Sequence, residues 1–435
     1  MRRGLLASFF LVLATAAGLA VSGAAPIQAS SASGLWSNAT RLSAGREEHT
    51  ATLLRNGTVL VTGGTDGRGK ALASAEVYNP ATNRWTPAGS MASARLDHTA
   101  TLLPSGKVLV AGGLGASFPS SSLATAELYD PTTNAWSTAA PMIGARARHT
   151  ATLLPDGRVL VVGGLSVALR EGGLWPSQPT GAEIYDPKAN RWTATAPMAL
   201  YRLDQTATLL SDGRVLVAGG QDGLISFDSV EIYDTRQDRW QAAAPMVTGR
   251  SGHAAALLAN GDVLVAGGTY STVVPSNASA PLSSAEIYDP ALNSWSTVAR
   301  MAEVRVEHTA TSLSGGMVLV IGATGQSRAE IYDPVHNIWS QFGETMNRYN
   351  HTATRLSNGE VLVVGGYGIE SLGSVLLYDP NGEPPVPGRP IDPRLVVGGL
   401  LAVLLVVGGV AWSIPAVRRR LRSRRPNGGQ EEWIT

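Results

Sequence analysis

One sequence unit of roughly 50 residues recurs seven times between residues 36 and 380, and this repetition limits the possible folds more than any other feature. Every unit contains an apolar run that ends in glycine or alanine, at residues 59–64, 108–113, 159–164, 215–220, 263–268, 318–323 and 361–366. A tyrosine turn of the Tyr-Asp-Pro type follows each run, at Tyr78, Tyr129, Tyr185, Tyr233, Tyr288, Tyr332 and Tyr378. Repeats of this length indicate an array or a propeller, because one unit alone cannot bury its apolar faces.

Each unit is expected to contain four short strands, so the pattern predicts an all-β fold. In the second unit these strands fall at residues 98–103, 107–112, 126–129 and around Trp136. Dipeptides such as Asn56-Gly57 and Asp156-Gly157 separate the first two strands, and we expect them to form two-residue type I′ hairpins with positive φ at both positions. A tryptophan follows the tyrosine turn in six units, at Trp85, Trp136, Trp192, Trp240, Trp295 and Trp339.

The Gly-Gly, Tyr-Asp-Pro and Trp pattern, with Met-x-x-x-Arg-x-x-His from Met91 to His98, resembles the kelch repeat in its bacterial, galactose-oxidase-like form. This resemblance implies a seven-bladed β-propeller over residues 30–380. The last unit lacks the tryptophan, whereas Trp36 precedes the first unit. We therefore expect an N-terminal strand around Trp36 to complete the last blade and close the ring, which would also cover a sheet edge.

The two ends of the chain are expected to direct the propeller to a membrane. Residues 1–29 have the basic start, apolar run and small residues of a signal peptide, with an uncleaved signal anchor as the alternative. A Pro-rich stalk at residues 381–394 precedes an uncharged stretch at 395–414 that is long enough to form one C-terminal transmembrane helix. The basic tail at 415–435 predicts a cytoplasmic C-terminus, with the propeller outside the cell membrane.

Charge and cysteine content exclude several classes of function. Between residues 4 and 380 there are 24 Lys and Arg against 29 Asp and Glu, so the repeat region is acidic and is not expected to bind nucleic acid. The chain has no cysteine, which excludes disulfides, thiolate metal sites and cysteine nucleophiles. The copper oxidases that share the resemblance need a cofactor made from a cysteine joined to a tyrosine, so that chemistry is not expected here.

Antiparallel geometry predicts which face binds a ligand. The loops between strands 2 and 3 and between strands 4 and 1 lie on one face, and the long ones, 165–182 and 269–285, carry Trp175 and Tyr270. On the same face the residue before the repeated histidine changes from unit to unit, as Glu48, Asp97, Arg148, Asp204, Gly252, Glu307 and Asn350. We predict ligand contacts at Glu48, Asp97, Arg148, Asp204, Glu307, Asn350, Trp175 and Tyr270. The alternatives are neutral loop insertions and an ordinary solvated surface.

Two other repeated positions are interpreted as structural. Six histidines recur once per unit, at His49, His98, His149, His253, His308 and His351, and this recurrence favours packing over a metal site. An arginine three residues earlier recurs in every unit, and a third-strand glutamate recurs in six, which predicts one structural ion pair per blade.

These observations favour a surface-anchored binding or adhesion module for an extracellular glycan, peptide or protein. Two alternatives stay open: an exported carbohydrate-active enzyme similar to the sugar-acid epimerases with this fold, and a structural component of the cell envelope. No catalytic residues and no cofactor are predicted, because the sequence contains no Ser-His-Asp grouping, phosphate loop or zinc spacing.

Overall fold

The computed structural model describes residues 34–116, 121–170, 173–177, 181–273, 278–368 and 373–382. Side chains at 169–170, 173–177, 278 and 324–326 are outside the description. The predicted signal peptide, the transmembrane stretch, the basic tail and nearly all of the predicted stalk also lie outside the described residues. Within the described part of the chain, no helix is long and apolar enough to cross a membrane.

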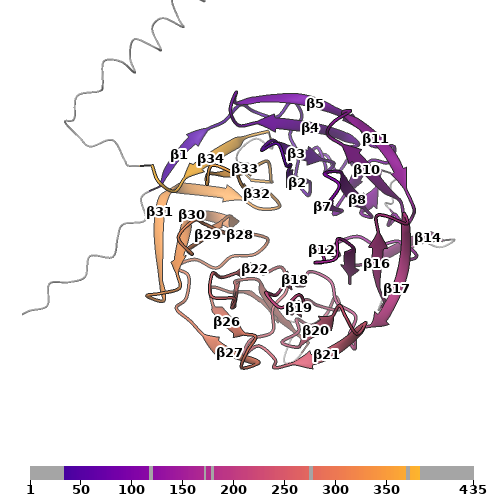
Figure 1. The fold of residues 1–435 in the computed structure, drawn as a ribbon. Coiled ribbons are helices and arrows are strands. Elements are labelled where there is room, and N and C mark those ends of the chain that lie inside the picture. Colours follow the sequence, from indigo (N-terminus) through magenta and orange to yellow (C-terminus); the bar gives the residue numbers. More distant parts are fainter. Residues whose placement is uncertain are drawn as a thin grey trace, which may run out of the picture. The chain divides into compact units, whose positions relative to one another are not determined.

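Seven four-stranded antiparallel sheets, the blades of a propeller, form a ring (Figure 1). The innermost strands of blades 1 to 7 are β2 (Thr50–Leu53), β7 (Thr99–Leu102), β12 (Thr150–Leu153), β18 (Thr206–Leu209), β22 (Ala254–Leu257), β28 (Thr309–Ser312) and β32 (Thr352–Arg355). The second strands are β3 (Val59–Thr62), β8 (Val108–Ala111), β13 (Val159–Val162), β19 (Val215–Ala218), β23 (Val263–Ala266), β29 (Val318–Ile321) and β33 (Val361–Val364). The prediction of an all-β, seven-bladed propeller is confirmed.

The third and outermost strands complete each blade. The third strands are β4 (Ser74–Asn79), β10 (Ala126–Asp130), β16 (Gly181–Asp186), β20 (Val230–Asp234), β26 (Ala285–Asp289), β30 (Ala323–Asp333) and β34 (Val375–Asp379). The outermost strands of blades 1 to 6 are β5 (Arg84–Ser90), β11 (Ala135–Ala139), β17 (Arg191–Pro197), β21 (Arg239–Ala243), β27 (Ser294–Thr297) and β31 (Ile338–Arg348). β1 (Leu35–Asn38) is the outermost strand of blade 7.

The hydrophobic core lies between neighbouring blades. The second strand of each blade is fully buried, and its side chains point alternately to the two adjacent blades. Val59 and Val61 of blade 1 pack against Leu362 of blade 7. Leu60, between them, packs against Val108 of blade 2. Seven such apolar layers stabilise the ring, and these strands therefore appear in the sequence as continuous apolar runs.

The N-terminal strand closes the ring as predicted. β1 pairs antiparallel with β34, with Trp36 opposite Tyr378. The Trp36 ring also lies 6.2 Å from Phe342 of blade 6, stacked at 12° between planes. Blade 7 therefore combines one strand from the start of the repeat region with three from its end.

The hairpins between first and second strands differ from the type I′ turns that we predicted. In blade 1 the Gly57 N–H donates to the Leu54 carbonyl, and Gly57 has φ of 81°. Asn56 does not have a positive φ, and its side chain accepts hydrogen bonds from Thr58 instead. This is a three-residue turn that ends in a left-handed glycine, and only Gly315 and Gly316 have positive φ at both positions.

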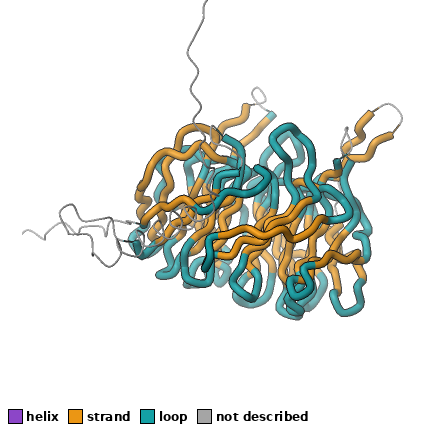
Figure 2. The backbone as a smooth tube through the Cα atoms, turned by 90° about the horizontal axis from the view of Figure 1, so that it is seen from above, coloured by secondary structure: helices purple, strands orange, loops and turns teal. Residues whose placement is uncertain are grey.

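Antiparallel strand order places all the 2–3 and 4–1 loops on one face of the propeller, which we call the loop face, and the 1–2 and 3–4 turns on the opposite turn face. Figure 2 shows the ring edge-on, with loops on both faces. Two long 2–3 loops contain strand ribbons of their own: β14 (Ser166–Arg170) with β15 (Gly173–Ser177), and β24 (Thr269–Thr272) with β25 (Ala278–Pro281). A shorter ribbon joins β6 (Arg95–Leu96) to β9 (Leu114–Gly115). Antiparallel partners within these loops supply the backbone hydrogen bonds that a loop would otherwise take from water.

Candidate functional site

A buried arginine fixes each 4–1 loop on the loop face. In blade 3 the Arg146 guanidinium donates to Glu183 at 2.7 Å and to the carbonyls of Gly163 and Gly181. Glu183 also accepts the backbone N–H groups of Ile143 and Gly144, so the pair bridges the loop and the third strand. The same ion pair occurs at Arg46–Glu76, Arg95–Glu127, Arg202–Glu231, Arg250–Glu286 and Arg305–Glu330. The predicted structural ion pairs are therefore present in six blades.

The repeated histidines connect neighbouring blades. His149 of blade 3 lies 3.0 Å from the Thr99 hydroxyl of blade 2, and His98 contacts Thr50 of blade 1 at the same distance. Burial lowers the pKa of His149 to about 3, and the nearby Arg146 charge acts in the same direction. The histidines are therefore neutral, and their role is packing between blades, as we predicted. Among the described residues, no group of three or more His, Asp and Glu side chains is arranged to hold a metal ion.

These neutral histidines predict acid sensitivity. An unfolded histidine takes up a proton below its ordinary pKa of 6.5, whereas folded His149 stays neutral to about 3. The contribution of neutral His149 to the free energy of unfolding is therefore fully present above pH 6.5, and it is lost as the pH falls from 6.5 towards 3. We expect His149→Gln to change stability little at pH 8 and to raise the free energy of unfolding by about 2 kcal/mol at pH 5.

Gln205 occupies the same position in blade 4 and donates to the Val162 carbonyl at 2.9 Å, so glutamine fits this environment. Urea unfolding of the wild-type protein and the variant at both pH values measures the difference. An identical pH dependence in the two proteins would contradict the neutral, buried state of His149.

Directly before the histidines, seven residues form a ring around the propeller axis. We call this set the axial ring; its members are Glu48, Asp97, Arg148, Asp204, Gly252, Glu307 and Asn350. All seven have φ between 52° and 60°. All seven positions are among the described residues. In six of the seven pairs from adjacent blades, the backbone N–H of one ring residue donates to the backbone carbonyl of the other at 3.0–3.4 Å. The backbone repeats, and only the side chains differ from blade to blade.

The axial ring brings together six of the eight predicted ligand-binding residues. Arg148 of blade 3 contacts Asp204 at 3.1 Å and reaches Glu307 of blade 6 at 3.6 Å, so its side chain crosses the axis. The Asn350 amide donates to Glu48 at 3.4 Å. Asp204 and Glu307 therefore share one guanidinium group, and the charges of Asp97 and Glu48 also act on it.

The crowding of these carboxyl groups alters their protonation. Burial raises the pKa of Glu48 to about 8, and the charges of Asp97 and Glu47 act in the same direction. Burial raises the pKa of Asp97 to about 6, although Arg148 opposes this shift. Burial also raises the pKa of Glu307, again against the Arg148 charge. Neighbouring carboxyl groups with separated pKa values are a recurrent feature of binding and catalytic sites.

Sequence reasoning missed Tyr201, which lies beside the axial ring. Its side chain is 7% exposed, and its hydroxyl has no hydrogen-bond partner in the structure. Burial raises the pKa of Tyr201 to about 12, and the Asp204 charge acts in the same direction. The signal was available, because the other units have smaller side chains at this position: Gly45, Ala94, Ala145, Gly249, Val304 and Asn347.

The two predicted aromatic contacts do not belong to the axial ring. Tyr270 lies on β24 and is 40% exposed, which fits an exposed aromatic on the loop face. Trp175 lies on β15 opposite Ala168, and its side chain is outside the description. Both positions are therefore on strand ribbons instead of irregular loops.

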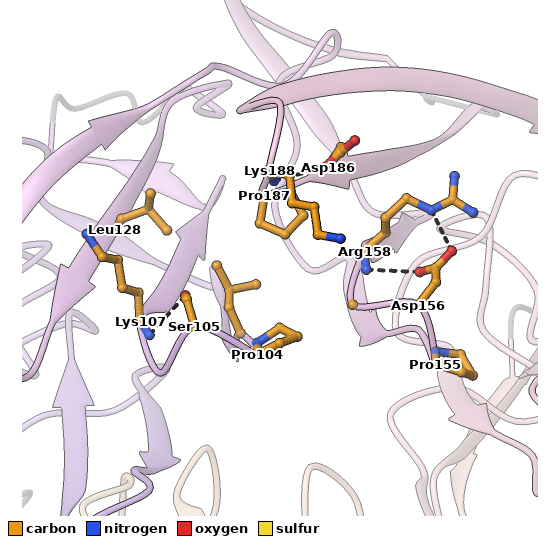
Figure 3. Close-up of a pocket in the computed structure, with 12 residues that line it drawn as sticks. Pro104, Ser105, Lys107, Leu128, Pro155, Asp156, Arg158, Asp186, Pro187 and Lys188 are labelled. Atoms are coloured by element: carbon orange, nitrogen blue, oxygen red, sulfur yellow. Dashed lines mark hydrogen bonds and ion pairs between the residues drawn. The ribbon is translucent and has the colours of Figure 1, made fainter.

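One hollow lies on the turn face, where the sequence predicted no site. It has a volume of about 770 Å³ and lies between blades 2 and 3, bordered by Pro104, Lys107, Leu128, Arg158 and Lys188 (Figure 3). Our prediction concerned the loop face because its loops vary in length. Side-chain changes within turns of constant length were the signal that this reasoning overlooked.

Comparison with known proteins identifies the repeated unit. The family model described as the kelch motif matches residues 49–92, 98–143, 205–247 and 250–302, which correspond to blades 1, 2, 4 and 5. The chain carries kelch motifs. Kelch-like protein 25 of Rattus norvegicus and its counterpart in Mus musculus are each 39% identical to this chain over 75 residues. The matched segment is 16% of this kelch-motif chain and only 12% of each relative.

Solved structures share the propeller. A fungal alcohol oxidase of the AA5 family, solved in complex with copper, superimposes with a TM-score of 0.60 at 18% identity, over 80% of this chain and 76% of the oxidase. The protein YjhT gives a TM-score of 0.54 at 15% identity, over 70% of this chain and all of YjhT. Identities this low establish the common fold alone.

Proposed function

We propose that the kelch propeller is a surface-anchored binding module that recognises an extracellular glycan, peptide or protein through its loop face. The axial ring is the observation that carries this proposal. Its backbone is nearly identical in all seven blades, whereas its side chains place four carboxyl groups around one arginine. Variation confined to side chains on a rigid scaffold is typical of a recognition surface.

The charges of the axial ring favour a particular class of ligand. Carboxylate oxygens accept hydrogen bonds from hydroxyl and ammonium groups, so a hydroxyl-rich or amine-bearing glycan suits the four acids. Arg148 can take part through its exposed surface, since its side chain is 37% exposed. Tyr270 offers an aromatic surface on the same face, on which the apolar side of a sugar ring packs.

The experiment is a binding screen of the full chain, in mild detergent, against glycans and cell-envelope extracts. The matched variant combines Glu48→Gln, Asp97→Asn, Asp204→Asn and Glu307→Gln. Amides keep the size of these side chains, and the positive φ of these positions makes alanine a poorer choice. We expect the affinity of the variant to be at least about tenfold lower, because the loss of a single charge-assisted hydrogen bond already has an effect of this size.

Binding of an amine-bearing glycan is also expected to strengthen as the pH rises from about 5 to about 7. Asp97 loses its proton at about pH 6, and its carboxylate then attracts the ammonium group, which is still protonated in this range. Equal binding by wild-type protein and variant would move the site to the β24–β25 or β14–β15 ribbon. Absence of binding by both would favour a structural role in the envelope.

A sugar-acting enzyme is the second candidate, because Glu48 and Asp97 have separated pKa values in one site. Incubating the same proteins with sugar acids and following the products by NMR distinguishes the two functions. Conversion by the wild-type protein and its loss in Asp97→Asn would favour the enzyme over the binding module.

Surface anchoring is part of the proposal and rests on the sequence alone. The signal-like residues 1–29 and the apolar stretch 395–414 support an external propeller and a cytoplasmic tail. Labelling intact cells with a membrane-impermeant reagent tests this orientation. We expect the reagent to label propeller residues on intact cells. Labelling only after lysis would contradict an external propeller.

A further inference from the structure

The turn face carries a groove that the proposed function does not use. We call it the turn groove and define it by Pro104, Leu128, Pro155, Arg158, Pro187 and Lys188, which border the hollow between blades 2 and 3. Leu128 and the three prolines supply apolar surface, and the two basic side chains supply positive charge (Figure 3).

The residues that form the turn groove depart from the repeat at this place. Blades 2 and 3 have proline as the first residue of the 1–2 turn. The other blades have Arg55, Ser211, Ala259, Ser314 and Ser357 at this position. Lys188 follows the tyrosine turn, where the other blades have Ala81, Thr132, Arg236, Ala291, Val335 and Asn381. The chain contains only three lysines, and two of them, Lys107 and Lys188, border this groove. The repeat alone therefore does not explain the composition of the groove.

Lys188 is the cation that is free to meet a ligand. Lys107 contacts Asp130 at 3.2 Å, and Arg158 contacts Asp156 at 2.7 Å. No acid pairs with the Lys188 ammonium within the described residues, and its side chain extends into the space between the two blades (Figure 3). Asp186 lies nearby: hydrogen bonds from the backbone N–H groups of Ala189 and Lys188 lower its pKa, and the Arg158 and Lys188 charges act in the same direction.

The groove continues into its neighbours, which favours a polymer over a small ligand. A hollow of about 400 Å³ between blades 1 and 2 shares Lys107 with the turn groove. Another, of about 580 Å³ between blades 3 and 4, shares Arg158 and adds Arg236. The three hollows form one strip across four blades, with a basic residue at each shared border.

One repeated position of the turn face carries a basic side chain in blades 2, 3 and 4 and in no other blade. At the first position after the hairpin glycine, blades 2, 3 and 4 have Lys107, Arg158 and Arg214. Blades 5 and 7 have Asp262 and Glu360 at this position. An anionic segment thus meets basic side chains along the strip, whereas it would meet the carboxylates of Asp262 and Glu360 on blades 5 and 7.

We propose that the turn groove binds an extended acidic segment of a partner polypeptide. A partner carboxylate pairs with the Lys188 ammonium, and apolar side chains on the same segment pack on Leu128 and the three prolines. The apolar lining distinguishes this ligand from an acidic polysaccharide, which would leave the leucine and prolines without apolar partners.

Fluorescence anisotropy with the full chain in mild detergent tests the proposal. The probe is a labelled peptide of repeating Glu-Pro-Leu triplets, and the matched control peptide has Gln in place of Glu. Lys188→Glu is compared with Lys70→Glu, because Lys70 lies in a 2–3 loop on the other face and the charge change is identical. We expect Lys188→Glu to weaken binding at least about tenfold and Lys70→Glu to leave it within about twofold.

Hydrogen exchange on the wild-type complex locates the peptide without any variant. Slower exchange at residues 103–107 and 186–189 on peptide addition supports the groove. Equal weakening by both lysine variants, equal binding of both peptides, or no binding would overturn the proposal. Binding of polygalacturonate in place of the peptide would overturn it in favour of an anionic glycan. The axial-ring variant is expected to bind the peptide normally, so this test stands apart from that of the loop face.

Discussion

Replacing Trp36 by glycine is expected to lower the free energy of unfolding by about 3 kcal/mol, and deleting residues 30–42 is expected to abolish a single cooperative unfolding transition. Trp36 packs on Tyr378 and Phe342, and its strand contributes the ladder that joins β1 to β34. Deletion leaves β34 as an open edge, so the apolar layer between blades 6 and 7 is exposed. Urea unfolding followed by tryptophan fluorescence and circular dichroism measures both changes.

Trp85→Gly provides a matched control for ring closure. Trp85 lies 5.0 Å from Tyr78 at 44°, nearly the geometry of Trp36 with Tyr378 at 5.1 Å and 44°. Its strand, however, is covalently continuous with the rest of blade 1. We expect Trp85→Gly to lower stability while unfolding stays cooperative. Cooperative unfolding of the deletion variant at wild-type stability would show that β1 does not close the ring.

Breaking one buried ion pair is expected to have a similar cost. Arg146→Ala leaves the Glu183 carboxylate without its guanidinium partner in a site where the two side chains are 2% and 3% exposed. Removing one partner of a buried ion pair typically costs about 3–5 kcal/mol. Glu183→Ala should cost a similar amount, because it also removes the acceptor of two backbone N–H groups.

A double-mutant cycle separates the pair from its surroundings. The double variant Arg146→Ala/Glu183→Ala is expected to be more stable than the sum of the single losses, by at least about 1 kcal/mol. The exposed pair Lys107–Asp130 serves as the control, with side chains 41% and 24% exposed, and should couple by no more than about 1 kcal/mol. Additive losses at Arg146 and Glu183 would contradict a structural role for their contact.

The fold was predictable because residues with a direct structural role recur at a fixed spacing in the sequence. The apolar runs, the tyrosine turns and the position of Trp36 predict blade number and ring closure without any contact information. The hairpin type was predicted wrongly, because an Asn-Gly pair fits two turns that differ in the φ of Asn56. Its side-chain hydrogen bonds to Thr58 favour the three-residue turn, and a dipeptide rule does not include them.

The candidate site was predictable in its members but not in its geometry. A position that varies within a constant repeat pointed to the axial ring, and Gly252 and Asn350 there even indicate a left-handed backbone. The contact between Arg148 and Glu307 could not be anticipated, because it joins blades on opposite sides of the axis. The turn groove was missed for a related reason, since it depends on packing between two turns that are separate in the sequence.

The pairing of β1 with β34 also determines when the molecule can finish folding. Blades 1 to 6 each use strands from one continuous stretch of chain, so each can assemble as its own residues are synthesised. Blade 7 cannot, because its outermost strand, β1, is made at the beginning and its other three strands at the end. During this interval Trp36 has no strand partner, and a long chain must close before the last contacts form, which is intrinsically slow. A circular permutation of residues 34–382, with these ends joined and new ends after Ser90, would turn this last step into a local hairpin, and synthesis order would no longer set the pace of closure.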